Sequence, residues 1–185
     1  MKYQDCLAYM RSDNYRVLGG DKRKNIFILW KDTLLYSGLA FMFWFRLEQC
    51  DDIFVRSFSR MIAFILSYWL HITIDRHTKI GYGFYLVHGG PVVINVSAKI
   101  GNNVDMYQFS TIGSANLHAA TIEDEVYIGP SVCVLEDVHI GRGATIGAGA
   151  VVVRDVPRGA TVAGVPAKVV SYKESGRFIR NKWKI

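Results

Sequence analysis

The chain has 185 residues, 50% of them hydrophobic, so it can form a domain with a substantial core and is too apolar to be disordered. Lysine and arginine exceed aspartate and glutamate by 22 to 16, a modest excess that suits an anionic ligand or a membrane surface. No nucleic-acid-binding motif accompanies this charge, which argues against a nucleic-acid partner. The three cysteines, Cys6, Cys50 and Cys133, lack CxxC spacing and predict reduced thiols and no metal site.

The N-terminal part of the chain predicts helices. It begins with MKYQDCLAYMRSDNYR, which is too polar for a signal peptide. Apolar stretches at residues 33–45 and 61–74 are shorter than the roughly 18 residues that favour a membrane-spanning helix, so we expect buried or subunit-packing helices. The alternative is a peripheral membrane contact through residues 30–70. Three tryptophans with basic neighbours suit a membrane interface in this region: Trp30, Trp44 and Trp69.

From about residue 72 the sequence repeats every six residues. Hexads such as IGYGFY, INVSAK, IGNNVD, IEDEVY and IGRGAT begin with an apolar residue and mostly carry a small residue at the fifth position. This period does not match the roughly 3.6-residue period of an amphipathic helix. Three hexads instead form one triangular coil with a short strand on each side, and the coils stack at about 4.8 Å. The repeat predicts a parallel β-helix over residues 72–170, between a helical segment (1–71) and a basic tail or short helix (171–185).

The hexads, and the run IGAGAVVVRDVPRGATVAGVPAKVV at 146–170, resemble the left-handed β-helix of the hexapeptide-repeat acyltransferases. GFYLVHGGPVVIN followed by QFSTIG is similar to the serine acetyltransferase branch, including bacterial capsule and exopolysaccharide acetyltransferases. The resemblance implies a mainly β fold of left-handed sense, a homotrimer, and acetyl-CoA as cosubstrate between subunits. It assigns the acetyl-CoA contacts to four residues: Pro130, Ala148, Arg154 and Lys168.

The repeat is interrupted twice, and each interruption carries a histidine. FYLVHGGPVVIN slips by two residues at His88, and SANLHAAT adds four residues around His118. The slips fall in neighbouring coils, so we expect both histidines to face one cleft, with Gly89 and Gly90 admitting a substrate or another chain. An imidazole with a pKa of about 6.5 suits removal of a hydroxyl proton during acetyl transfer. By resemblance, the catalytic histidine is His88 and the loop histidine is His118.

Two positions depart from the family pattern. The acidic residue that orients the catalytic histidine is replaced by Thr73, so Asp75 is the expected substitute, unless no carboxylate serves. The aspartate that precedes the catalytic histidine in serine acetyltransferases is Val87 here, which cannot pair with an ammonium group. Val87, together with an N-terminal segment shorter than in those enzymes, speaks against free serine as the acceptor.

These departures favour direct acetyl transfer to a hydroxyl of a sugar in surface-polysaccharide biosynthesis. Serine O-acetylation is the alternative, and a non-catalytic β-helix scaffold is another. A γ-carbonic-anhydrase-like metal protein is disfavoured because His88, His118 and His139 do not repeat its spacing. The predicted location is cytoplasmic, with contact to the inner face of the membrane left open.

Overall fold

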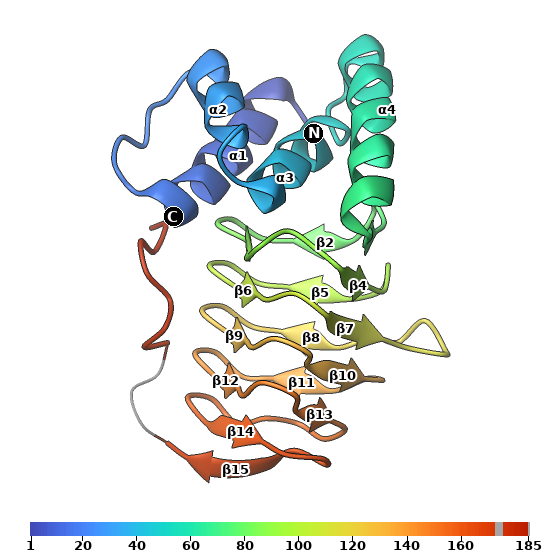
Figure 1. Ribbon diagram of the computed structural model, residues 1–185, viewed down its shortest axis with the longest axis vertical. Coiled ribbons are helices and arrows are strands. Elements are labelled where there is room, and N and C mark those ends of the chain that lie inside the picture. The colour runs from blue at the N-terminus through green and yellow to red at the C-terminus, as the bar shows by residue number, and fades with distance from the viewer. Residues whose placement is uncertain (173–175, 185) are drawn as a thin grey trace.

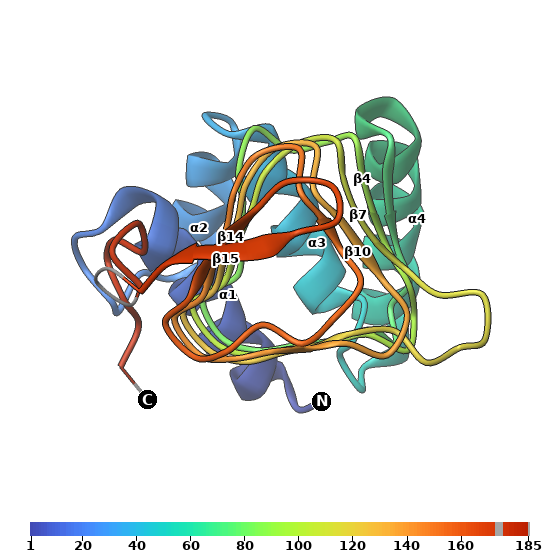
Figure 2. The same cartoon turned by 90° about the horizontal axis from the view of Figure 1, so that it is seen from below.

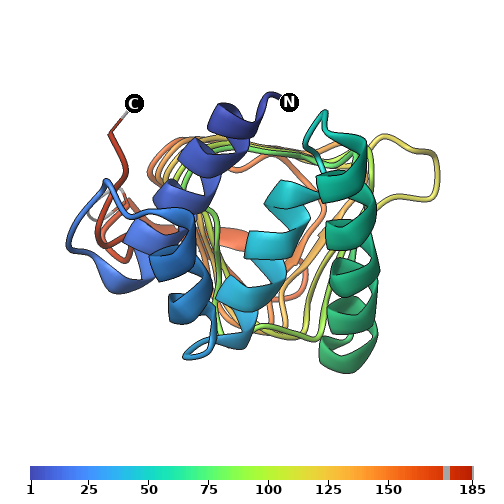
Figure 3. The same cartoon turned by 90° about the horizontal axis from the view of Figure 1, so that it is seen from above.

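A computed structural model describes residues 1–172 and 176–184 and shows a helical cap on one end of a three-sided β-helix (Figure 1). Seen along the axis, the coils superpose as a prism, with helices lying across its upper end (Figures 2 and 3). The cap contains four helices: α1 (Tyr3–Leu18), α2 (Ile26–Thr33), α3 (Ser37–Leu47) and α4 (Ile53–Leu70). The predicted β-helix with a helical N-terminal segment is therefore confirmed.

Three sheets form the sides of the prism, and all strands but the last run parallel. Sheet A contains β1 (Ile72–Ile74), β4 (Val92–Ile94), β7 (Ser110–Gly113), β10 (Cys133–Leu135) and β13 (Val151–Val152). Sheet B contains β2 (Lys79–Ile80), β5 (Lys99–Ile100), β8 (Thr121–Ile122) and β11 (His139–Ile140). Sheet C contains β3 (Tyr85–Leu86), β6 (Asp105–Met106), β9 (Tyr127–Ile128), β12 (Thr145–Ile146), β14 (Thr161–Ala163) and the antiparallel β15 (Lys168–Ser171).

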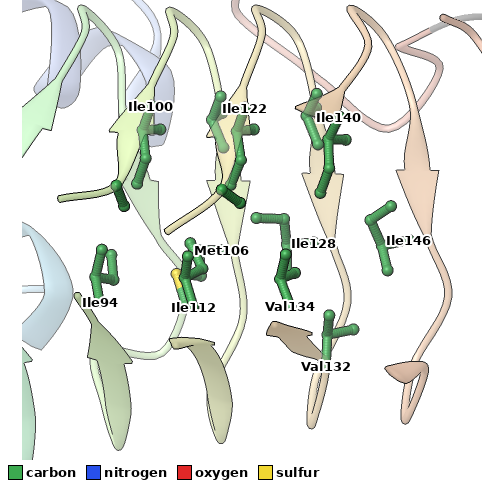
Figure 4. Close-up of a cluster of buried hydrophobic side chains, with 14 of the residues drawn as sticks. Ile94, Ile100, Met106, Ile112, Ile122, Ile128, Val132, Val134, Ile140 and Ile146 are labelled. Carbon is green, nitrogen blue, oxygen red and sulfur yellow. The ribbon is translucent and has the colours of Figure 1, made fainter. Parts of the chain in front are cut away.

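The first residues of the hexads form the core, as the period predicts. In sheet B, Ile80, Ile100, Ile122 and Ile140 are successive register partners, and all point inward (Figure 4 shows the last three). Each such side chain contributes roughly 1.5–3 kcal/mol by leaving water. The small fifth residues are buried at the corners, Ala144 and Ala150 among them, because a larger side chain would not fit there.

A buried ion pair closes the upper end of the β-helix. The first coil has no coil above it, so its backbone groups need other partners. Arg46 donates to the carbonyl oxygens of Ile80 and Gly81 at 2.8 and 2.7 Å, and the amide of Phe84 donates to Asp13 at 2.9 Å. Arg46 and Asp13 also pair with each other at 2.8 Å. The cap therefore replaces the hydrogen bonds that a further coil would supply.

The two apolar stretches of the cap behave differently. α3 is buried as expected, with Phe41, Phe45 and Leu47 among its buried residues. The expectation that the helix at 61–74 is buried within its own chain is wrong, while packing of this helix against another subunit stays a prediction. α4 begins at Ile53, and only 11% of its 18 residues are buried. Among the described residues it is the one helix whose length and composition would allow it to cross a membrane.

The tail forms no helix in its described part. β15 extends to Ser171, one residue beyond the predicted boundary, and residues 176–184 run back along sheet C to the cap (Figure 1). Lys182 pairs with Glu125 at 2.5 Å, and Asn103 exchanges two hydrogen bonds with the backbone of Trp183. Residues 173–175 and 185 of the predicted tail lie outside the described residues.

Candidate active site

His88 lies at the corner where sheet C passes into sheet A in the first coil. This C–A corner has five residues there, 87–91, and three in the next coil, 107–109. The two-residue slip in the sequence is therefore an enlargement of one corner. His88 adopts a φ of 63°, a left-handed conformation that is uncommon for a residue other than glycine, and its side chain is exposed.

The glycines beside His88 accommodate the chain's own helical cap. A Cβ atom on Gly90 would lie 2.0 Å from the carbonyl oxygen of Leu70 at the end of α4. One on Gly89 would lie 2.5 Å from Oγ of Ser37 at the start of α3. The expectation that these glycines admit a substrate or a second chain is corrected: they let the cap contact the corner, which fixes the position of His88 relative to the helices.

A cleft of about 280 Å³ lies beside His88. Its walls are the α2–α3 connection, the start of α3 and strand β3, through residues that include Tyr36, Ser37 and Tyr85. The Ser37 hydroxyl donates to the carbonyl oxygen of His88 at 3.3 Å. Because the N-terminal end of a helix carries partial positive charge, α3 favours an anionic group in this cleft.

The ring of His88 has an aromatic neighbour and no carboxylate partner among the described residues. The centroids of His88 and Tyr107 are 6.1 Å apart, with an interplanar angle of 69°. The histidine–carboxylate pairs that the structure contains involve His77 and His139 instead. His139 pairs with Glu123 at 2.9 Å on the exposed surface, and no group of metal-ligating side chains occurs in the described part of the chain.

Asp75 does not contact His88 within one chain. It follows β1, at the corner between sheet A and sheet B, whereas His88 precedes β4 at the opposite edge of sheet A. Its carboxylate accepts a hydrogen bond from the amide of His77 at 2.8 Å and so stabilises its own turn. Thr73 lies between these two corners, paired with Val93. Neither position supplies a partner for the imidazole of the same chain.

His118 also lies away from His88. Its loop, residues 114–120, joins β7 to β8 at the A–B corner and projects from the prism (Figures 1 and 2). The Ser114 hydroxyl accepts a hydrogen bond from the His118 amide at 3.0 Å, and Ser114 in turn contacts Glu136. The expectation of one cleft shared by both histidines is therefore wrong for a single chain, because the two slips fall at different corners of the prism.

The residues expected to contact CoA occupy three regions. Pro130 and Ala148 lie at the C–A corner, in the column that begins with His88. Ala148 is exposed. Arg154 follows β13 at the A–B corner, while Lys168 begins β15 at the lower end of sheet C. Both cations are exposed. A single chain thus places two of the four residues along one edge with His88.

Known proteins give the site a family context. The family description "Bacterial transferase hexapeptide (six repeats)" matches residues 119–154. Serine acetyltransferase of Bacillus licheniformis is 39% identical over 152 residues, which span 80% of this chain and 69% of the relative. Serine acetyltransferase of Escherichia coli strain K12 is 36% identical over 126 residues, or 64% of this chain and 46% of the relative.

Solved structures agree with these relatives. A serine acetyltransferase in complex with CoA is 28% identical, with a TM-score of 0.67 over 90% of this chain and 68% of that one. Neisseria gonorrhoeae serine acetyltransferase in complex with serine is also 28% identical. Its TM-score is 0.74 over 89% of this chain and 69% of that one.

These comparisons overturn the expectation of a sugar acceptor, because these relatives and structural neighbours are serine acetyltransferases. They give no support to a capsule or exopolysaccharide branch or to polysaccharide biosynthesis. A short N-terminal segment does not exclude a relationship to serine acetyltransferases, because these enzymes differ in length. The matched residues span 69% of the Bacillus licheniformis enzyme but 46% of the E. coli enzyme. Val87 does not exclude serine either, because it concerns a single contact to the ammonium group and its side chain is only 5% exposed. The chain belongs to the hexapeptide-repeat transferase family, as an acyltransferase related to the serine acetyltransferases.

Proposed function

We propose that the protein transfers an acetyl group from acetyl-CoA directly to the hydroxyl of L-serine. The imidazole of His88 removes the hydroxyl proton, and the serine oxygen bonds to the thioester carbonyl carbon. The carbon–sulfur bond then breaks as the imidazolium gives its proton to the leaving sulfur, which releases CoA as a thiol. The observation that carries this proposal is the exposed His88 in a cleft at the head of the C–A corner. The relationship of the chain to serine acetyltransferases supports L-serine as the acceptor.

The cleft can bind an amino acid through its carboxylate, although Val87 cannot pair with the ammonium group. The start of α3, at Ser37 and Gly38, lines the same cleft as His88 and favours the carboxylate of serine. A carboxylate held there would keep the neighbouring hydroxyl within reach of the imidazole. Val87 takes no part in binding the ammonium group in this arrangement.

For CoA, we propose that the C–A corner holds the pantetheine arm along Pro130 and Ala148. The exposed Ala148 leaves the backbone accessible to the arm. Lys168, and Arg154 of a neighbouring subunit, would supply positive charge for the phosphates. The solved complexes with CoA support CoA as the ligand of the family.

We further propose a homotrimer whose active sites are shared between subunits. His88 and His118 lie at opposite edges of sheet A, so one chain cannot bring them together. The outer face of that sheet carries a column of register partners with little charge: Thr73, Val93, Thr111, Cys133 and Val151. Packing this face against other subunits would cover apolar surface and carry the 114–120 loop of one chain to the His88 corner of the next.

The first experiment measures release of CoA thiol from acetyl-CoA with L-serine and, as comparison acceptors, L-threonine and nucleotide sugars. Serine should stimulate thiol release by the wild type. The serine-dependent rate of His88→Ala should be at least about a hundredfold lower, since general-base catalysis contributes that much. His139→Ala is the matched control and should retain full activity, because His139 pairs with Glu123 on the exposed surface. Stimulation by a sugar alone, or equal rates in His88→Ala, would refute the proposal.

Shared sites are tested by coexpressing His88→Ala with His118→Ala. In randomly mixed trimers about one quarter of the sites would combine an intact His88 with an intact His118 from the next chain. Activity should return to about a quarter of the wild-type value, while each variant alone stays inactive. If each site used both histidines of one chain, the mixture would be as inactive as its parents.

The exposed face of α4 suggests contact with an anionic membrane surface, and we propose cytoplasmic localisation with this contact. The face consists of large apolar side chains, each at least 46% exposed: Phe54, Phe58, Met61, Phe64, Ile65, Tyr68 and Trp69. The only charged residues of the helix are Arg56 and Arg60. Apolar and aromatic residues beside arginines suit the boundary between lipid headgroups and acyl chains.

Membrane contact is tested by sedimentation with vesicles that contain phosphatidylglycerol. The wild type should bind, and Phe58→Ser with Phe64→Ser should bind at least about tenfold more weakly, because both remove apolar area. Tyr172→Ser, which changes an aromatic residue that is 66% exposed outside α4, should bind normally. Absence of binding, together with loss of oligomers in the α4 variant, would assign the face to a second copy of the chain.

A further inference from the structure

A second cavity, of about 470 Å³, lies on the outer face of sheet C. It is enclosed by the end of α1, strands β3, β6 and β9, and the returning tail. The cleft beside His88 lies above the C–A corner and shares Tyr85 with this cavity. The cavity is thus a neighbour of the candidate active site, and it contains none of the four residues expected to contact CoA.

Four aromatic side chains line the cavity: Tyr85, Tyr107, Tyr127 and Phe178. The rings of Tyr107 and Tyr127 are 5.1 Å apart, and those of Tyr127 and Phe178 are 4.9 Å apart, so three rings form a continuous wall. Burial raises the pKa of Tyr127 to about 12, and it also raises the pKa of Tyr85. The phenols therefore stay neutral at physiological pH and present both a ring face and a hydrogen-bond donor.

Three arginines line the same cavity. Arg16 is almost fully buried and pairs with Asp105, the one carboxylate among the described residues that line the cavity. Nη1 of Arg16 has no hydrogen-bond partner among the described residues. Arg177 and Arg180 come from the tail and have no ion-pair partner in the described ranges. The cavity therefore carries more positive than negative charge, and guanidinium groups match phosphate and carboxylate oxygens.

The tail is held where its arginines reach the cavity. Lys182 pairs with Glu125, and Trp183 is fastened by hydrogen bonds of 2.7 and 3.0 Å to Asn103. Nζ of Lys22 lies 5.1 Å from the centre of the Trp183 ring. The guanidinium of Arg177 stacks over Phe178 at 4.6 Å. A tail held by these contacts loses less conformational freedom on binding a ligand than a loose tail would.

We propose that this cavity binds a small organic anion, in which a planar ring carries a phosphate or carboxylate group, at a site separate from the CoA corner. The ring packs against the Tyr127–Phe178 wall, and the anionic group is bound by Arg177 and Arg180. Tyr107 lines the cavity and also contacts the ring of His88, so occupancy of the cavity bears on the catalytic histidine. The binding claim does not depend on the proposed function, because binding is measured without turnover.

The test is calorimetric titration of the full chain with phenyl phosphate and with inorganic phosphate, with and without saturating CoA. Phenyl phosphate should bind once per chain, at least about tenfold more tightly than inorganic phosphate, and CoA should not displace it. Arg177→Gln and Arg180→Gln should each weaken binding of both probes about tenfold or more. Tyr127→Leu should weaken binding of phenyl phosphate alone. Arg158→Gln is the matched control: it removes an exposed arginine that does not line the cavity, and it should bind like the wild type.

Three outcomes would overturn the proposal: no saturable binding, displacement by CoA, or equal weakening in Arg158→Gln. Displacement by CoA would mean that the probe occupies the CoA site. Equal weakening would mean nonspecific attraction to a positively charged protein. Circular dichroism of each variant checks that the fold is retained. Because serine-dependent turnover is measured separately, failure here leaves the proposed acetyl transfer untouched, and failure of acetyl transfer leaves the binding result intact.

Discussion

The side chains of Asp13 and Arg46 form an ion pair in which they are 2% and 1% exposed, and this pair joins α1 and α3 to the first coil of the β-helix. Removing one member leaves a buried charge without its partner. We expect Arg46→Leu to lower the free energy of unfolding by about 3–5 kcal/mol, measured by urea denaturation. Arg142→Leu, which removes an exposed partner of Glu125, should lower the free energy of unfolding far less, because water screens an exposed ion pair. Similar losses in the two variants would show that the buried pair does not hold the cap.

The contact between α3 and the corner of His88 depends on Gly38. A Cβ atom there would lie 2.0 Å from the carbonyl oxygen of Leu86, so Gly38→Ala must displace the helix or the corner. We expect a loss of several kcal/mol in stability and a fall in activity larger than the loss of folded protein explains. In Gly113→Ala the new Cβ would have no neighbour nearer than 3.6 Å, and this variant should behave like the wild type. An active, stable Gly38→Ala would show that the cap does not position His88.

Glu48 gives stability a defined pH dependence. Burial raises its pKa from 4.5 to about 7, while Arg60 and Arg76 act in the opposite direction. The folded protein therefore binds a proton more tightly than the unfolded chain, and this contribution to stability is lost as pH rises from about 4.5 to 7. Glu48→Gln should remove that loss and make the protein more stable than the wild type at pH 8, with little effect at pH 4.5. Chemical denaturation at both pH values is the measurement, and a gain that is equal at the two would contradict it.

Tyr107 is the aromatic neighbour of His88, in place of the expected carboxylate. If the ring edge positions the imidazole, Tyr107→Leu should lower kcat for serine acetylation roughly tenfold to a hundredfold and leave the KM for acetyl-CoA unchanged. Tyr107→Phe keeps the ring and should restore most of the rate. Equal rates in Tyr107→Leu and the wild type would leave His88 without a positioning residue in its own chain.

The short-range pattern was sufficient for the β-helix. Hexads place one apolar residue inward per side, so the column of Ile80, Ile100, Ile122 and Ile140 follows from the period. The two slips also located the irregular corners, and the five-residue corner of His88 accounts for the first. Local sequence determines these features because each strand pairs with the equivalent strand of the next coil.

Other features depended on the three-dimensional arrangement. Gly89 contacts the start of α3 and Gly90 the end of α4, and the hexad pattern does not predict these contacts with the helical cap. The exposed face of α4 could not be told from a buried one, because apolar composition does not reveal how much surface the rest of the fold covers. The cavity on sheet C joins α1 to a tail more than 150 residues later, as the 165-residue separation of Arg16 and Asn181 shows.

By itself the sequence determined the repeat, the family resemblance and the histidines at the slips, because these are properties of neighbouring residues and of a regular period. Only the tertiary structure decided which corner each histidine occupies, and therefore that His88 and His118 are separated within one chain. A β-helix has three equivalent corners per coil. A change in the count of residues shows that a corner is enlarged, but the face toward which its side chains point is fixed only when the coils close and the cap packs on them.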